Sequence, residues 1–263
     1  MKNVIAAAMI AAVGAGASAA NIYSTSFESP EYVTGNLLGQ NGFLSASAPA
    51  NLFQVGNVAG FARTGSQFVF VNTAAQTSSG SNWHYRDDSI ASVTPPNSII
   101  RASVYTAVLN NSPAAVNRQS AGGIDLYDFS GARIGAIRVR NDGAVTILNS
   151  ASSAGTLSAG TVVGNAYNQV AIEADYALGV VRYYINGAQI NTSSLGATWA
   201  NFNAAGGFGD ADLYTVRTNT NTTTNSGGHT VLFDDFSLAA IPTPGVLSLA
   251  GLAGLIAARR RRA

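Results

Sequence analysis

The stretch of the sequence with the most evident chemical potential is Trp83-His84-Tyr85-Arg86-Asp87-Asp88. In an extended chain, side chains alternate between two faces, so Trp83 and Tyr85 share one face while His84 and Arg86 share the other. Two aromatic rings can stack on a sugar ring, and neighbouring Arg and Asp side chains can hydrogen-bond its hydroxyls. Trp83, Tyr85 and Arg86 are therefore candidate sugar contacts. The alternative is ordinary aromatic core packing with a solvated edge.

A second candidate platform for a sugar is Trp199, which follows Gly196-Ala197-Thr198 in a loop-like region. Acid–base chemistry at His84 would need a nucleophile next to it, and the sequence contains no Gly-x-Ser-x-Gly or similar elbow. With two histidines and no cysteine in the whole chain, a transition-metal site is hard to assemble.

Glycoside hydrolysis needs two carboxylates on either side of the scissile bond. The concanavalin-like glucanases carry Glu-x-Asp-x-x-Glu on one strand, and the corresponding string here is Glu173-Ala174-Asp175-Tyr176-Ala177-Leu178. Leu178 occupies the position of the second glutamate, so the pair is incomplete. We therefore expect no catalytic residues, and we expect Asp175 to open the turn that leads into Val180.

The distribution of charge argues against a polyanionic partner. The chain has 263 residues, and Lys2 and the four arginines Arg259–Arg262 lie at its two ends. The segment between Glu28 and Asp235 holds nine arginines against all thirteen acidic residues, so its net charge is −4. Such a segment binds nucleic acid poorly. The absence of cysteine also excludes a disulfide framework.

The N-terminus has the three parts of a secretory signal peptide. Lys2 supplies a positive charge, Val4–Val13 is an unbroken apolar run, and Ala17-Ser18-Ala19 provides the small residues that signal peptidase requires. We predict a signal peptide over residues 1–19, cleaved after Ala19 or Ala20, so that the protein enters the export machinery. The alternative is a buried N-terminal helix.

The C-terminus also consists of three parts, over residues 241–263. Pro242-Thr243-Pro244-Gly245 is followed by an apolar segment at 246–258 and then by Arg259, Arg260, Arg261 and Arg262. A helix over 246–258 would be about 20 Å long, which is short of the roughly 30 Å hydrocarbon core. The arginines favour the cytoplasmic side, which places the rest of the chain outside. Transient membrane contact fits this length better than a permanent anchor.

This tail resembles the PEP-CTERM sorting signal of exported bacterial proteins, which combines a Pro-x-Pro motif, an apolar segment and a terminal arginine cluster. The family's middle residue is most often Glu, where this sequence has Thr243. The resemblance implies processing by an exosortase, a membrane protease-transpeptidase, and delivery to the cell surface or the extracellular polymer. A plain tail anchor is the alternative.

The body of the chain, residues 20–240, is predicted to be one all-β domain. Lys is absent from it and Glu occurs at three positions, while Val, Thr, Asn, Ser and Gly are abundant, a composition that disfavours helices. Asn186-Gly187, Ser130-Gly131 and Asn141-Asp142-Gly143 mark hairpin turns. The polar stretch 217–228 is expected to be an exposed loop. Strands are predicted at 67–71, 98–109, 123–129, 133–140, 144–148, 169–175, 180–185, 188–192 and 231–238.

The pieces Asn168–Ile172 and Gly179–Gly187 resemble hairpins of concanavalin A-like (laminin-G-type) jelly rolls. Phe27-Glu28 and Leu232–Leu238 are similar to the first and last segments of exported jelly-roll proteins. The resemblance implies an antiparallel jelly-roll β-sandwich. A galactose-binding-type jelly roll is the competing assignment.

In either jelly roll the first and last strands often pair, which would bring Glu28 near Asp234 and Asp235. Carbohydrate-binding jelly rolls often hold a structural calcium through such carboxylates, and oxygen ligands suit that ion. The three residues are therefore a candidate calcium site, and no other cofactor is expected. Asp210 and Asp212 lie two residues apart in an expected Gly-rich loop, and on one face if that segment is extended. They give a weaker metal signal because no Asp-x-Asp-x-Asp-Gly loop surrounds them.

These observations predict an exported, non-catalytic cell-surface or extracellular-matrix protein whose candidate ligand is extracellular polysaccharide. Two alternatives stay open. One is a polysaccharide-degrading glycoside hydrolase or lyase on a jelly-roll fold, and the other is a purely structural envelope or biofilm protein.

Overall fold

The fold is described from a computed structural model that covers residues 19–47, 51–72, 80–94, 98–110, 118–149, 157–190, 202–219 and 229–242. Trp199, Ala17 and the sorting residues from Thr243 to Arg262 lie outside these ranges. Within them, no helix is both long and apolar enough to span a bilayer.

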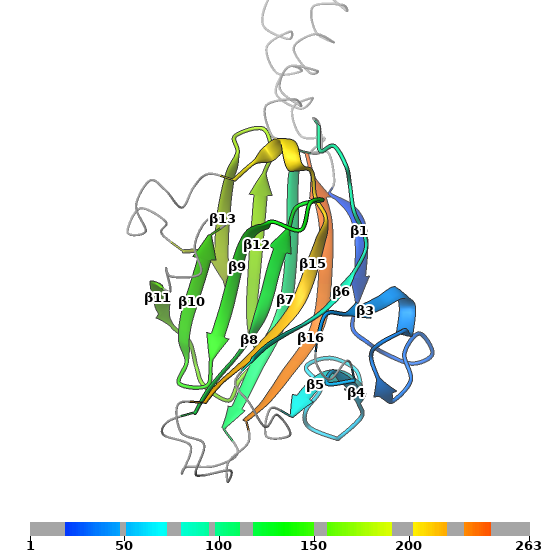
Figure 1. Cartoon of the computed structure of the whole chain (residues 1–263). Coiled ribbons are helices and arrows are strands. Elements are labelled where there is room, and N and C mark those ends of the chain that lie inside the picture. The colour runs from blue at the N-terminus through cyan, green and yellow to red at the C-terminus, as the bar shows by residue number, and fades with distance from the viewer. Residues whose placement is uncertain are drawn as a thin grey trace, which may run out of the picture.

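The described residues form two antiparallel sheets that pack face to face (Figure 1). Sheet A has nine strands, in the order β14 (Ala188–Gln189), β13 (Val180–Ile185), β12 (Asn168–Asp175), β7 (Ile99–Asn110), β16 (His229–Ile241), β5 (Phe68–Asn72), β4 (Gln54–Gly56) and β2 (Gly35–Asn36), with β1 (Ala20–Thr25) also paired to β16. Sheet B has seven strands, in the order β11 (Leu157–Thr161), β10 (Ala144–Asn149), β9 (Arg133–Arg140), β8 (Arg118–Tyr127), β15 (Asp210–Asn219), β6 (Gly80–Arg86) and β3 (Phe43–Ser45). Two short 3₁₀ turns, Gln40–Gly42 and Ala204–Gly206, complete the elements.

The core lies between the two sheets, where each contributes one face of alternating side chains. Val104 and Ile172 of sheet A and Ile124, Ile137 and Leu213 of sheet B are fully buried in one cluster. Full burial of such side chains stabilises a fold by about 1.5–3 kcal/mol each. The prediction of an antiparallel jelly-roll β-sandwich is therefore confirmed for the body of the chain.

The last strand joins distant parts of the sequence. β16 pairs with β7 along one edge, while its other edge pairs first with β5 and then with β1. The change of partner coincides with a bulge between Asp234 and Ser237, at which Asp235 has a positive φ of 48°. The expected pairing of first and last strands is confirmed, and the bulge leaves room for a loop to dock beside β16.

The predicted hairpins agree closely with the structure. Gly131, Gly143 and Gly187 all have positive φ, as their turns require, and the strands at 133–140 and 180–185 have the predicted bounds. The predicted loop at residues 217–228 was wrong at its start. Strand β15 extends to Asn219, so residues 217–219 belong to a strand. Backbone pairing with β8 extends β15 as far as Asn219.

Candidate functional site

The outer face of sheet B carries aromatic and charged side chains in register across four strands. Tyr85 of β6, Asp212 of β15 and Asp125 of β8 lie directly opposite one another. Two residues away on each strand, and on the same face, Trp83 lies opposite Tyr214. Cross-strand neighbours on one face have Cβ atoms about 4.5–5.5 Å apart, so the register itself gathers these groups.

Asp125 is the centre of this arrangement and is fully buried. Its Oδ1 accepts a hydrogen bond from Arg138 Nε at 3.1 Å, and its Oδ2 accepts one from Arg138 Nη2 at 2.6 Å. Trp83 Nε1 and the Tyr127 hydroxyl each donate to Oδ2 at 3.3 Å. A carboxylate with this many donors holds its partners in fixed positions.

Arg138 also stacks on an aromatic ring, with its guanidinium carbon 3.4 Å from the centroid of Tyr214. Tyr214 in turn meets Trp83 edge-on at a centroid distance of 5.6 Å. Gly123 of β8 lies between Tyr214 and Arg138 in the register, and a Cβ there would come within 2.0 Å of the Ile137 carbonyl oxygen. The glycine thus allows β8 and β9 to approach closely where the guanidinium crosses to the tyrosine ring.

A groove of about 270 Å³ opens beside this network and is lined by Ala46, Trp83, Tyr85, Tyr127, Gly131, Asp210 and Asp212. Asp212 is 5% exposed, and its Oδ1 has no hydrogen-bond partner. Burial raises the pKa of Asp212 well above its ordinary value, and the neighbouring carboxyl of Asp210 adds to this shift. Burial likewise raises the pKa of Asp210. The groove therefore offers aromatic rings next to two neighbouring carboxyl groups.

The residues predicted from the sequence separate into two groups. Trp83 and Tyr85 share the groove face, as alternation predicted. His84 points the other way into the core, where it is fully buried and stacks on Phe53 at 4.3 Å. Arg86 also leaves the groove face: it pairs with Asp88 at 3.1 Å and lies over the ring of Tyr23. Arg86 is therefore not positioned as a sugar contact beside Trp83 and Tyr85.

Sequence reasoning did not single out Ala46, Tyr127 or Gly131 for the groove, and it did not connect Asp210 and Asp212 with Trp83. Asp210 and Asp212 were expected in a loop, yet they begin strand β15 and face the same side of sheet B as Trp83. The available signal was the alternation of polar and apolar residues in Asp210-Ala-Asp-Leu-Tyr214 and in Asp125-Leu-Tyr127. Arg138 gave no signal of its own, because its role depends on pairing between strands.

The candidate calcium residues hold a loop in place instead of forming an open site. Glu28 Oε1 accepts hydrogen bonds from the backbone of Ser66 at 2.8 Å and Gln67 at 2.7 Å. Asp234 Oδ2 accepts from the backbone of Arg63 at 2.9 Å and Thr64 at 3.1 Å. The two carboxylates therefore bind opposite ends of one short segment, residues 63–67.

Asp235 binds the same segment through side chains. Its Oδ1 accepts from the Thr64 hydroxyl at 2.7 Å, and its Oδ2 pairs with the guanidinium of Arg63. Burial raises the pKa of Asp234 to about 6, although backbone hydrogen bonds oppose the shift. Because protein donors occupy these oxygens, and because no cluster of three metal-ligating side chains occurs in the described part of the chain, the three acids do not fit a calcium site.

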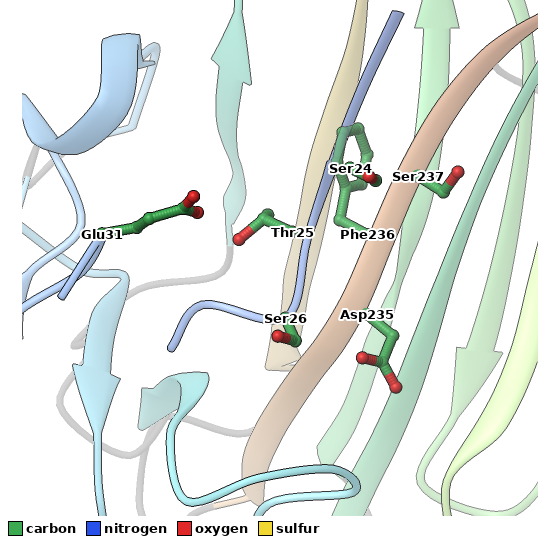
Figure 2. Close-up of a pocket in the computed structure, with 7 residues that line it drawn as sticks. All are labelled: Ser24, Thr25, Ser26, Glu31, Asp235, Phe236 and Ser237. Carbon is green, nitrogen blue, oxygen red and sulfur yellow. The ribbon is translucent and has the colours of Figure 1, made fainter. Parts of the chain in front are cut away.

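A second groove, of about 390 Å³, lies along β1 and β16 (Figure 2). Figure 2 shows Ser24 and Thr25 on β1, with Ser26 directly after it and Glu31 further along the same chain. On the β16 side it shows Asp235, Phe236 and Ser237. Phe236 is its one aromatic lining residue and is 2% exposed, so this groove has hydroxyl and carboxylate groups but no accessible ring for stacking.

No protein-family model matches the sequence, and no curated protein matches it. Solved structures do resemble the fold. One, reported for endo-acting O-glycanases of the human gut microbiota, has a TM-score of 0.52 at 8% identity and covers 84% of this chain and 100% of that chain. Another, an alginate lyase mutant in complex with alginate trisaccharide, has a TM-score of 0.50 at 12% identity and covers 85% of this chain and 100% of that chain.

A sialidase matches 72% of this chain at a TM-score of 0.44 and 7% identity, but the match spans only 17% of the sialidase chain. Identities this low establish the fold and leave the activity open. The class that the fold defines is the jelly-roll β-sandwich, a class in which carbohydrate-active proteins are found.

Proposed function

We propose that this chain is an exported, non-catalytic protein that binds polysaccharide through the groove on the outer face of sheet B. The observation that carries the proposal is the groove itself: Trp83, Tyr85 and Tyr127 line it together with the carboxyl groups of Asp210 and Asp212. Protein sites for sugars combine such rings, which stack on the sugar's C–H face, with polar groups that bind its hydroxyls.

The network around Asp125 supports this function because it pre-orders the rings. Trp83 and Tyr127 are both hydrogen-bonded to the same buried carboxylate, and Arg138 anchors that carboxylate from β9. Side chains that are fixed before binding lose little conformational entropy when a ligand arrives.

The arrangement of carboxyl groups favours binding over hydrolysis. Asp210 and Asp212 lie two residues apart on one strand and on the same face of sheet B, whereas hydrolysis needs two carboxylates that face each other across the sugar. The third carboxylate, Asp125, is neutralised by Arg138. None of the three therefore has the opposed partner that a glycosidase uses.

An enzymatic alternative has one observation in its favour, which is the raised pKa of Asp212. A carboxyl group whose pKa is raised by burial holds its proton more readily and is a candidate general acid. Release of reducing ends or unsaturated sugars from a glycan by the wild-type protein, and its loss in Asp212→Asn, would favour this alternative. Release of neither product is the outcome expected from the binding proposal.

The sequences of the two ends of the chain support a proposal for where the protein is delivered. We propose that residues 1–19 direct export, and that the tail at 241–263 is handled by an exosortase-type enzyme that delivers the body to the cell surface or matrix. Intact-mass analysis of the protein recovered from its own cell envelope tests both steps, because loss of each segment changes the mass by a known amount. A full-length mass in the cytosol would refute this part.

Affinity electrophoresis of the purified protein in gels that contain single polysaccharides tests the binding proposal. We expect at least one polysaccharide to retard the wild type, and Trp83→Ala and Tyr85→Ala to abolish the retardation. Tyr184→Ala is the matched control, since Tyr184 is an aromatic residue on β13 of sheet A, whose neighbours are Glu173 and Arg101. Equal loss in the Tyr184 variant, or no retardation by any polysaccharide, would overturn the proposal and leave a structural role.

A further inference from the structure

The chemistry of the groove narrows the class of glycan. Asp212 is buried to 95% of its surface, lines the groove and has an Oδ1 atom with no hydrogen-bond partner. A buried polar oxygen without a partner carries a free-energy penalty that a ligand hydroxyl would remove. Asp210 Oδ1 is likewise buried and without a partner. The groove therefore presents two acceptors that await donors.

The charges that face these two carboxyls are mostly negative. Asp87 acts on Asp210, and Asp125 acts on Asp212, while the phenol of Tyr127 lies in the field of both Asp125 and Asp212. On the positive side are Arg133 and Arg138, and the ion pair with Asp125 neutralises the second of these. Among the described residues that line the groove, two are carboxylic acids and none is an arginine or lysine.

From this balance we propose that the groove binds an uncharged glycan, with Asp210 and Asp212 bonded to its hydroxyls and Tyr85, Trp83 and Tyr127 against its rings, and that it rejects polyuronates. The inference rests on the proposed function and assigns its ligand class. A uronate carboxylate placed in this groove would meet the negative charge of the Asp210–Asp212 pair, with no cationic side chain among the described lining residues to offset it. In a partly buried setting such repulsion is poorly screened.

The proposed ligand class differs from the ligand of the structurally similar alginate lyase. Alginate, the ligand in the alginate lyase complex, is a polymer of uronic acids and carries one negative charge per sugar. Shared architecture would suggest the same ligand, whereas the carboxyl-rich groove predicts its exclusion. The fold and the groove chemistry thus make opposite predictions, and one binding assay decides between them.

The experiment compares retardation of the purified full-length protein by neutral polysaccharides (laminarin, xylan, galactomannan), polyuronates (alginate, polygalacturonate) and cationic chitosan. We expect binding to at least one neutral glycan and none to either polyuronate. Asp212→Ala should weaken the binding of the neutral glycan about tenfold, as the loss of a hydrogen bond to a charged group does. The control Asp142→Ala, which removes the same charge from an exposed turn, should leave it unchanged.

A gain of binding provides the complementary test. Replacing both acids, Asp210→Asn with Asp212→Asn, keeps the side-chain shapes and should allow measurable retardation by alginate. Wild-type binding to alginate or chitosan that Tyr85→Ala abolishes would overturn the ligand class while the groove stays the binding site. Absence of binding to every polysaccharide would instead overturn the proposed function. Thermal unfolding of each variant shows whether a loss reflects misfolding.

Discussion

Arg138 of β9 and Tyr214 of β15 meet across the intervening strand β8, with the guanidinium carbon 3.4 Å from the centre of the ring. The same guanidinium binds Asp125, which is fully buried. The positive charge is thus enclosed by a carboxylate on one side and an aromatic face on the other, which ties three neighbouring strands together on the face that carries the groove.

Separating the Arg138–Asp125 pair should destabilise the fold strongly. Asp125→Asn leaves a buried guanidinium without its counter-charge, and loss of one partner of a buried pair costs about 3–5 kcal/mol. Urea unfolding followed by circular dichroism measures the change. The matched control is Arg140→Gln, which breaks the pair with Asp142, whose side chain is 49% exposed; such surface pairs contribute about 0–1 kcal/mol. Equal effects of the two substitutions would contradict this account of the network.

Gly123→Ala should disrupt the pairing of β8 with β9. The added methyl group would lie 2.0 Å from the Ile137 carbonyl oxygen, so the strands must separate, at a cost of about 2–3 kcal/mol. Gly80→Ala is the control, because a Cβ there meets nothing within 4 Å, and it should be neutral or stabilise by up to about 1 kcal/mol. The melting temperatures of the two variants test this prediction. An unchanged melting temperature for Gly123→Ala would contradict it, because it would mean that β8 and β9 can separate without loss of stability.

Glu28→Gln should loosen the segment at residues 63–67. The substitution weakens two backbone hydrogen bonds, from Ser66 and Gln67, that end on a charged acceptor. Hydrogen bonds to charged groups contribute about 1.5–3 kcal/mol, so tryptic cleavage after Arg63 should accelerate about tenfold. Mass spectrometry of timed digests follows this one cleavage. Glu31→Gln, which removes the same charge nearby, should leave the rate unchanged, and a similar acceleration there would contradict the assignment.

Calcium should not stabilise the body of the chain through Glu28, Asp234 and Asp235. Their oxygens already accept hydrogen bonds from residues 63–67, so a metal ion would have to displace these donors. We expect the same melting temperature in excess calcium and in excess chelator. A rise with calcium in the wild type that is absent in Glu28→Gln would restore the calcium site predicted from the sequence.

Asp212→Asn should change how stability depends on pH. Burial raises the pKa of Asp212 in the folded state above its ordinary value of 3.8, so the folded state favours the protonated form. The stabilisation from this preference is complete below the unfolded-state pKa and is lost as pH rises through the raised value. The variant, which cannot ionise there, should therefore gain stability relative to the wild type as pH rises. Urea unfolding between about pH 4 and pH 8 measures the difference, and a constant difference would refute it.

The fold could be predicted largely because turns and alternation are local signals. Asn186-Gly187 forms its hairpin with positive φ at both residues, and Asp175 caps the preceding turn by accepting from the backbone of Ala177 and Leu178. Such features depend on residues a few positions apart, which a sequence displays directly. The short edge strands, such as β2 at Gly35–Asn36, lacked any comparable pattern.

The candidate site could be predicted only in part, because it is assembled by register between strands. Alternation placed Trp83 and Tyr85 on one face, but it could not show that Asp212 lies opposite Tyr85, or that Arg138 binds the carboxylate that holds Trp83. For the same reason the acids Glu28, Asp234 and Asp235 were expected to hold a metal. In the structure these acids accept hydrogen bonds from residues 63–67, which lie more than thirty positions from Glu28 in the sequence.

The pairing of β1 with β16 has a consequence for how the molecule is made. Ala20 lies opposite Ala240, so the first strand has no neighbour until almost the entire body of the chain has been synthesised. Contacts this far apart in sequence form late and slowly. During synthesis, and on the proposed route through a translocation channel, the pairing of β1 with β16 would thus not yet have formed. Sheet A would be completed only when β16 becomes available to pair with β1, on whichever side of the membrane that strand emerges.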